Sequence, residues 1–364
     1  MLDRIAEAIK RQDYRLAAKL LKPLIQTDSK NPWVRFYAGR IKEGLGKREE
    51  AERIYLYLLP KTTNPKLMSQ IRQGIARLEA AARSQKEQAI SESLAGEGGD
   101  KLGVLILEPI DPEARQEAAK AFGKIMNMDA YTARLRLPVR GWRLYRPGKI
   151  GELDYYVSRL QQVNIPSFCQ PLSPIDAIEV LEVHYFQTLE PRVRIRCQNQ
   201  DGQEGGFDFN WGEVTQRIIG RIPLFESVVV WDARRNIKRK TQKQDSVPFC
   251  DLHLGDRNCI LRFCDRTYQF QQGITFAAKP TSLPLGERDT ASKNWHYLTQ
   301  FLDEALGDRP LHDNFNIFAE TAIDFRETLD RMALRIDLER RKPSLWDRAF
   351  QLYSGLHFFR KSSP

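Results

Sequence analysis

The first quarter of the chain spaces its apolar residues as amphipathic helices do. Apolar side chains recur every three or four positions through residues 1–84, and prolines near the ends of the periodic stretches stop one helix and start the next. Residues 66–84 form the last stretch, with Leu67, Ile71 and Leu78 at helical spacing. The pattern predicts a helical domain over residues 1–84 that ends in a capping helix.

An internal repeat of 34 residues organises this domain. The segment Tyr14-x-x-Ala17-x-x-x-Leu21-x-x-Leu24 is matched by Arg48-x-x-Ala51-x-x-x-Tyr55-x-x-Leu58. The small side chains of Ala17 and Ala51 indicate that two helices cross closely there, and Gly46 indicates a tight turn between helices. Two units fall below the roughly three repeats that a stable stack normally needs, so the rest of the chain or another copy is expected to cover the open face.

The repeat resembles the tetratricopeptide repeat (TPR) family, in which each unit is a helical hairpin. The first unit lacks the two glycines of the family pattern and carries Ile5 and Gln12 there. In the second unit, Ala38 replaces the usual large apolar residue before the glycine, and Trp33 sits two places earlier than the family's tryptophan. The whole chain is also similar to uncharacterised TPR proteins of cyanobacteria, a resemblance that implies no activity. The positions that match the pattern are Gly39, Gly46, Ala51 and Tyr55.

The resemblance implies a groove lined by the first helix of each hairpin. By family position, the predicted partner-binding residues are Trp33, Phe36, Arg40, Gln70 and Arg77. An aromatic pair beside two arginines suits an acidic or C-terminal peptide segment of a protein partner. The alternative is that Trp33 and Phe36 belong to the hydrophobic core.

The pattern changes after residue 84. Residues 85–101 are polar, small and glycine-containing, which predicts a linker. Short apolar runs then alternate with helical stretches through residues 102–175 in the order β-α, β-α-β. This order predicts a small α+β module with a ferredoxin-like pattern, a likeness that carries no function.

Residues 176–290 have the alternating and apolar runs of short strands. Turn signals separate several of these runs, which predicts an antiparallel sheet closed into a small barrel or sandwich. Helical patterns return in residues 291–364, with helices predicted at 292–306, 315–340 and 344–359. The chain is therefore expected to be a multidomain α and α+β protein.

The last predicted helix has a wide apolar face with aromatic residues, and Arg360 and Lys361 follow it. Packing within the protein is the favoured interpretation. The alternative is peripheral contact with a membrane through residues 344–361, because an aromatic apolar face with terminal cations is typical of interfacial helices.

Charge is concentrated in the helical domain. Residues 1–90 hold 19 lysine and arginine residues against 10 acidic ones, a net charge of +9 out of the +10 of the whole chain. This excess indicates an acidic protein surface, nucleic acid or an anionic membrane as partner. The alternative is that the charges form the solvated outer faces of helices. The whole chain, with 29% charged and 41% hydrophobic residues, has the composition of an ordinary globular protein.

The cysteines and the N-terminus favour a cytoplasmic protein. Five cysteines in a chain of 364 residues suit reduced thiols better than a disulfide framework. The N-terminus begins directly as an amphipathic helix, and no stretch approaches the roughly 18 apolar residues of a membrane span.

Two clusters suggest specific chemistry. Cys250, His253, Cys259 and Cys264 offer sulfur and nitrogen ligands, but their spacing is not that of a standard zinc site, so buried thiols are favoured and no metal is predicted. The basic run at 234–240 would suit RNA, although lysines on an exposed edge strand also guard against edge-to-edge pairing.

No catalytic signature or cofactor motif appears in the sequence. Phosphate-binding, zinc-protease and nucleophile-elbow motifs are missing, and the five histidines share no spacing. We therefore expect a non-enzymatic adaptor or assembly factor that binds a protein partner through its basic helical domain. An RNA-binding protein and a membrane-surface scaffold are the alternatives.

Overall fold

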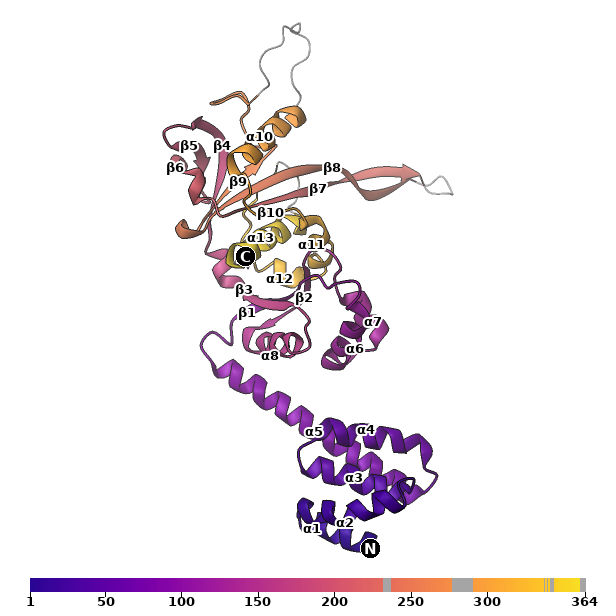
Figure 1. Ribbon diagram of the computed structural model, residues 1–364. Helices are drawn as coiled ribbons and strands as arrows, with labels where there is room; N and C mark the ends of the chain where they lie inside the picture. The colour runs from indigo at the N-terminus through magenta and orange to yellow at the C-terminus, as the bar shows by residue number, and fades with distance from the viewer. Residues whose placement is uncertain (232–236, 277–290, 337, 339, 341–343, 361–364) are drawn as a thin grey trace. The chain divides into compact units, whose positions relative to one another are not determined.

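The chain divides into two compact units, Met1–Glu92 and Ser93–Pro364. Helices come first, then strands in two sheets, then further helices, so the predicted mixture of α and β structure is confirmed (Figure 1). The computed structural model describes residues 1–231, 237–276, 291–336, 338, 340 and 344–360.

The first unit is built from helices. The sequence predicts a linker over residues 85–101, but most of this segment is helical. Its alanine, glutamine, glutamate and lysine residues are good helix formers even without an apolar stripe. The helices are α1 (Leu2–Lys10), α2 (Tyr14–Thr27), α3 (Pro32–Gly44), α4 (Arg48–Leu58) and α5 (Pro65–Ala95), with a short 3-10 turn at Leu59–Lys61.

The turns of the two hairpins have the same backbone conformation. Gly46, between α3 and α4, has φ +76°, a left-handed value that glycine adopts without steric cost. Gln12 stands 34 positions earlier, between α1 and α2, and has φ 61° although it is not a glycine. Both turns thus contain a residue with a left-handed φ, although only the second turn has a glycine at that position.

Small residues hold the helices of this unit close together. Ala17 and Ala51 are fully buried. A Cβ atom on Gly39 would lie 2.6 Å from Cε1 of Tyr55, so this position of α3 accepts no larger residue without movement of that ring. The burial of Ala17 and Ala51 is consistent with the predicted close crossings, and the contact of Gly39 with Tyr55 shows one close approach between α3 and α4.

Replacing either alanine with leucine is expected to destabilise the chain by about 1–3 kcal/mol, because the added atoms overpack a close crossing. Urea denaturation of Ala17→Leu and Ala51→Leu, followed by helical circular dichroism, measures the effect. Ala80→Leu, on an exposed part of α5, is the matched control. Unchanged midpoints for both core variants would show that the crossings are not close.

The second unit begins with a three-stranded antiparallel sheet in the order β2-β1-β3. Leu105 and Leu107 of β1 pack beneath α6, α7 and α8, while Val104 and Ile106 face the opposite side. A short helix, α9 (Leu172–Asp176), follows β3. The other elements are β1 (Leu102–Leu107), α6 (Arg115–Met126), α7 (Ala130–Arg136), β2 (Arg143–Lys149), α8 (Ile150–Gln161) and β3 (Ser167–Pro171).

The larger sheet has seven strands in the order β10-β7-β8-β9-β4-β5-β6. The predicted barrel is wrong: the sheet is open, with β10 and β6 at its two edges, and the pairs β4–β9 and β7–β10 are parallel. Short 3-10 turns lie at Trp211–Glu213 and Gly255–Arg257. The strands are β4 (Glu179–Thr188), β5 (Val193–Gln198), β6 (Glu204–Phe209), β7 (Gln216–Trp231), β8 (Ile237–Leu254), β9 (Cys259–Cys264) and β10 (Leu311–His312).

Helices cover both faces of this sheet. Leu298, Leu302 and Leu306 of α10 (Ala291–Leu306) pack on one face. Phe315 and Phe350, from α11 (Phe315–Ala322) and α13 (Leu345–Phe359), belong to a core on the other face that also includes residues of the three-stranded sheet. Figure 1 shows α11, α12 (Arg326–Leu329) and α13 between the two sheets. The segments predicted as separate modules therefore share one core.

The continuous helix predicted over 315–340 is wrong, because the described residues of this range form two short helices, α11 and α12, that are separated by residues 323–325. Tertiary hydrogen bonds replace helical ones in the segment that follows: Ala333 N donates to Asp176 Oδ1, and Arg262 Nη1 donates to Arg335 O. Met332 and Ile336 are buried by this path.

The predicted helix at 344–359 is confirmed as α13, and its apolar face lies inside the protein. Ser344 caps its N-terminus, and Leu352, Tyr353 and Leu356 are nearly or fully buried. Packing, the favoured interpretation, thus accounts for the aromatic face that also suggested membrane contact.

Candidate partner-binding site

The two predicted aromatic residues pack against the core of the first unit. Phe36 is 3% exposed, and its ring lies 5.9 Å from that of Tyr55. Trp33 is half-buried and meets the Phe36 ring edge-on, with centroids 6.0 Å apart. Because the Phe36 side chain is buried in the core, a binding partner cannot contact it.

The two predicted arginines already share a carboxylate. Arg77 donates to both oxygens of Glu43 at 2.8 and 3.1 Å, and Arg40 Nε lies 3.9 Å from Glu43 Oε2. The Tyr55 hydroxyl also donates to Glu43, at 2.7 Å. Burial opposes the ionisation of Glu43, but the hydrogen bonds from Arg77 and Tyr55 and the arginine charges outweigh it and lower its pKa. Gln70, from α5, is half-buried.

A groove that sequence reasoning missed lies on α3 and α4. Its volume is about 390 Å³. Ala38 and Ile54 supply apolar walls, and Tyr57 is 46% exposed at the rim. The signals for it in the sequence are the departures from the TPR pattern at Ala38 and at the displaced Trp33. The residues that line the groove are Arg35, Ala38, Arg53, Ile54 and Tyr57.

Two cations, Arg35 and Arg53, line this groove, and a third, Lys61, lies at its rim. Lys61 Nζ lies 3.6 Å from the centre of the Tyr57 ring, and Arg35 Cζ lies 4.9 Å from it. Hydrogen bonds from Lys61 and Arg35, together with their charges, lower the pKa of Tyr57. Arg53 is exposed, and its Nε donates only to the backbone oxygen of Glu49, at 3.3 Å. In the described part of the first unit, no carboxylate forms an ion pair with any of these three cations.

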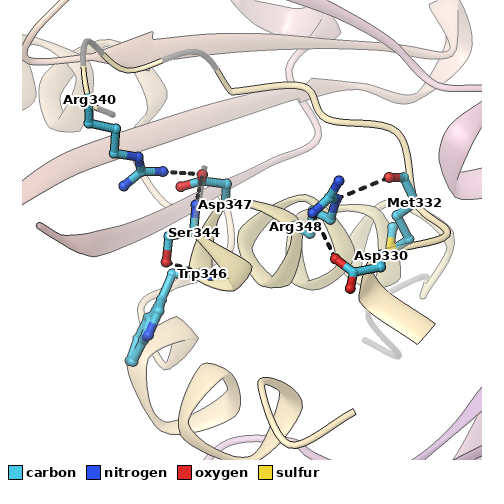
Figure 2. Close-up of polar contacts among 7 residues, drawn as sticks. All are labelled: Asp330, Met332, Arg340, Ser344, Trp346, Asp347 and Arg348. Atoms are coloured by element: carbon cyan, nitrogen blue, oxygen red, sulfur yellow. Dashed lines mark hydrogen bonds and ion pairs between the residues drawn. The ribbon is translucent and has the colours of Figure 1, made fainter. Parts of the chain in front are cut away.

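Two cavities of the second unit contain arginines that are paired with carboxylates. In a cavity of about 630 Å³ at the start of α13, Arg340 reaches the buried carboxylate of Asp347, and Arg348 donates to Asp330 at 3.0 Å (Figure 2). Burial raises the pKa of Asp347 despite this contact. In the described residues, by contrast, Arg35, Arg53 and Lys61 at the α3–α4 groove have no carboxylate partner.

A second cavity, of about 560 Å³, lies beside α10. Arg217, which is 8% exposed, pairs in it with Asp303. The buried charge of Arg217 in this cavity is therefore already neutralised by Asp303.

The four candidate zinc ligands lie on two opposite faces of the large sheet, two on each face. Cys250 and Cys259 belong to the core beneath α10, whereas Cys264 belongs to the core around α13, and His253 bonds to Ser354 of α13. Burial raises the pKa of the Cys250 and Cys259 thiols to about 12, so they behave as neutral apolar groups. Across the described residues, no three His, Cys, Asp or Glu side chains are grouped to hold a metal.

A buried polar network fastens α13 to the sheet. Arg262 forms two bonds with Asp251, at 2.8 and 2.7 Å, and Ser354 Oγ donates to Asp251 at 2.6 Å. His253 Nε2 lies 2.9 Å from Ser354 Oγ, and its Nδ1 lies 3.0 Å from Gln216 Nε2. These partners are consistent with His253 donating through Nε2, so the imidazole is not placed to take the serine proton. Ser354 is fully buried, and the network acts here as structural support.

The basic run lies only partly in the described structure. Lys238 and Lys240 pair with Val230 and Val228 across the β7–β8 hairpin. Arg234 and Arg235 lie outside the described residues.

No family model, curated protein or solved structure matches the chain. None of the helices in the described residues has the length and apolar character needed to cross a membrane.

Proposed function

We propose that the chain is a non-enzymatic adaptor or assembly factor that captures a protein partner through its Met1–Glu92 unit. The observation that carries the proposal is the α3–α4 groove, where Arg35 and Arg53 flank apolar walls and Lys61 lies at the rim, and none of the three forms an ion pair with a carboxylate in the described residues. The charge excess of residues 1–90 supports an acidic partner, because complementary charge speeds and orients association. The unpaired state of all five cysteines supports a cytoplasmic setting.

Affinity capture from extracts of the native host tests this function. The tagged full chain is expected to enrich a defined set of proteins, and a chain without residues 1–92 is expected to lose them. Nuclease-treated extracts separate protein partners from the RNA-binding alternative, and membrane-free extracts separate them from the scaffold alternative. Retention of the same proteins by residues 93–364 alone would contradict the proposal.

A further inference from the structure

The groove lies where the sequence departs from the pattern that it otherwise resembles. Trp33 stands two places before the tryptophan of that pattern, which makes Arg35 the residue at the tryptophan position, and Ala38 occupies the position of a large apolar residue. Both Arg35 and Ala38 line the groove. In the pattern that the sequence resembles, two large side chains would occupy these positions of α3; in this chain the space beside them is open.

The walls of the groove suit an apolar side chain. Ala38 and Ile54 present only aliphatic atoms, and the volume of about 390 Å³ is enough to hold one large side chain of a partner. Burying an aromatic side chain against such a surface removes apolar area from water and so favours binding. The Tyr57 ring is less suited to stack on a nucleotide base, because Lys61 and Arg35 lie over it.

The rim supplies the second element of recognition. Arg35 of α3 and Arg53 of α4 line the groove, and Lys61, from the turn after α4, lies over the Tyr57 ring at its rim, as Arg35 does. Arg35 Nε is held by the backbone oxygen of Ser29 at 2.8 Å, which limits the freedom of its guanidinium. Carboxylates that flank an inserted residue are therefore complementary to the charge at this rim.

We infer that the α3–α4 groove binds an acidic peptide segment by taking up one of its aromatic side chains, while flanking carboxylates pair with Arg35, Arg53 and Lys61. This inference rests on the proposed adaptor function and specifies the site and the partner chemistry. It differs from the predicted groove because Arg40 and Arg77 are occupied by Glu43.

A defined peptide tests the chemistry directly. The probe is a fluorescein-labelled heptapeptide with a central tryptophan between three glutamates on each side, titrated with the full chain and followed by anisotropy. Replacing the peptide's tryptophan by alanine is expected to weaken binding at least 10-fold, and raising NaCl from 50 to 500 mM is expected to weaken it further by screening. Equal affinity of the tryptophan and alanine peptides would overturn the inference.

Variants of the chain locate the site. Ala38→Leu fills the floor and is expected to weaken peptide binding at least 10-fold without lowering the thermal melting temperature. Arg53→Glu, at an exposed position, is expected to weaken binding at least 5-fold. Ala80→Leu and Arg83→Glu, on exposed parts of α5, are the matched controls and should bind like the parent chain.

The outcomes separate this inference from the adaptor function. If protein capture depends on residues 1–92 but neither Ala38→Leu nor Arg53→Glu weakens peptide binding, the adaptor function stands and the groove is not its site. If the peptide binds as expected but no protein is captured, the groove chemistry stands and the adaptor function fails. Tighter binding of a single-stranded RNA oligonucleotide of equal charge, lost in Ala38→Leu, would overturn the assignment to a peptide.

Discussion

Lowering the pH from 7 to 5 is expected to destabilise the Ser93–Pro364 unit by about 4 kcal/mol, because two histidines are buried in neutral form. Burial lowers the pKa of His253 to about 3 and that of His357 to about 2. In the unfolded chain both titrate near pH 6.5, so the unfolded state takes up protons that the folded state refuses. The stability is present above pH 6.5 and is lost as the pH falls toward 3.

His357 provides the sharpest test of this effect. Its ring stacks on Trp142 at 3.8 Å and on His312 at 3.9 Å, and its Nε2 atom is buried without a hydrogen-bond partner. His357→Phe keeps an aromatic ring in this stack and removes one titrating group. The loss between pH 7 and 5, measured by urea denaturation, should therefore fall by about half. An equal loss in this variant and in the parent would contradict the explanation, and His296→Phe, at an exposed position, is the control.

Replacing Arg262 with methionine is expected to cost about 3–5 kcal/mol, because it leaves the carboxylate of Asp251 buried without its charge partner. The side chains of Arg262 and Asp251 are 2% and 0% exposed, and two hydrogen bonds join them. Ser354 would remain as a donor to Asp251, but a hydroxyl does not neutralise a buried charge.

A surface pair gives the matched comparison. Arg194 and Asp208 form an equally close ion pair with side chains 56% and 37% exposed. Arg194→Met should cost less than about 1 kcal/mol, because solvent already screens this pair. Similar denaturation midpoints for Arg262→Met and Arg194→Met would contradict a structural role for the buried network.

Local patterns predicted the helical unit well because its contacts are close in sequence. The spacing of Ala17 and Ala51 identified helix crossings, and Gly46 identified a turn, since each depends on residues within one hairpin. The open sheet was not predictable in the same way. Alternation identifies a strand but not its neighbour, and β10 is a two-residue strand whose pairing with Arg217 and Ile218 of β7 is set by tertiary packing.

The candidate site shows the same limit. The family position of Phe36 predicted a groove residue, but its distance from Tyr55 places it in the core. Arg77 looked like a free cation because Glu43 lies 34 positions from it in sequence and meets it only in the fold, whereas the contact of Glu43 with Arg40, three positions away, is local. The groove at Arg35 and Ala38 was visible only as a departure from a pattern, and its shape required the packed helices.

Photo-crosslinking from the groove tests the central claim most directly. A benzophenone amino acid is placed at Tyr57 in one full-length variant and at Arg83, on an exposed part of α5, in another. The account predicts that the captured partner crosslinks from position 57 and not from position 83, and that Ala38→Leu in the first variant abolishes the crosslink. A crosslink from position 83 alone, or one from position 57 that persists with Ala38→Leu, would contradict it.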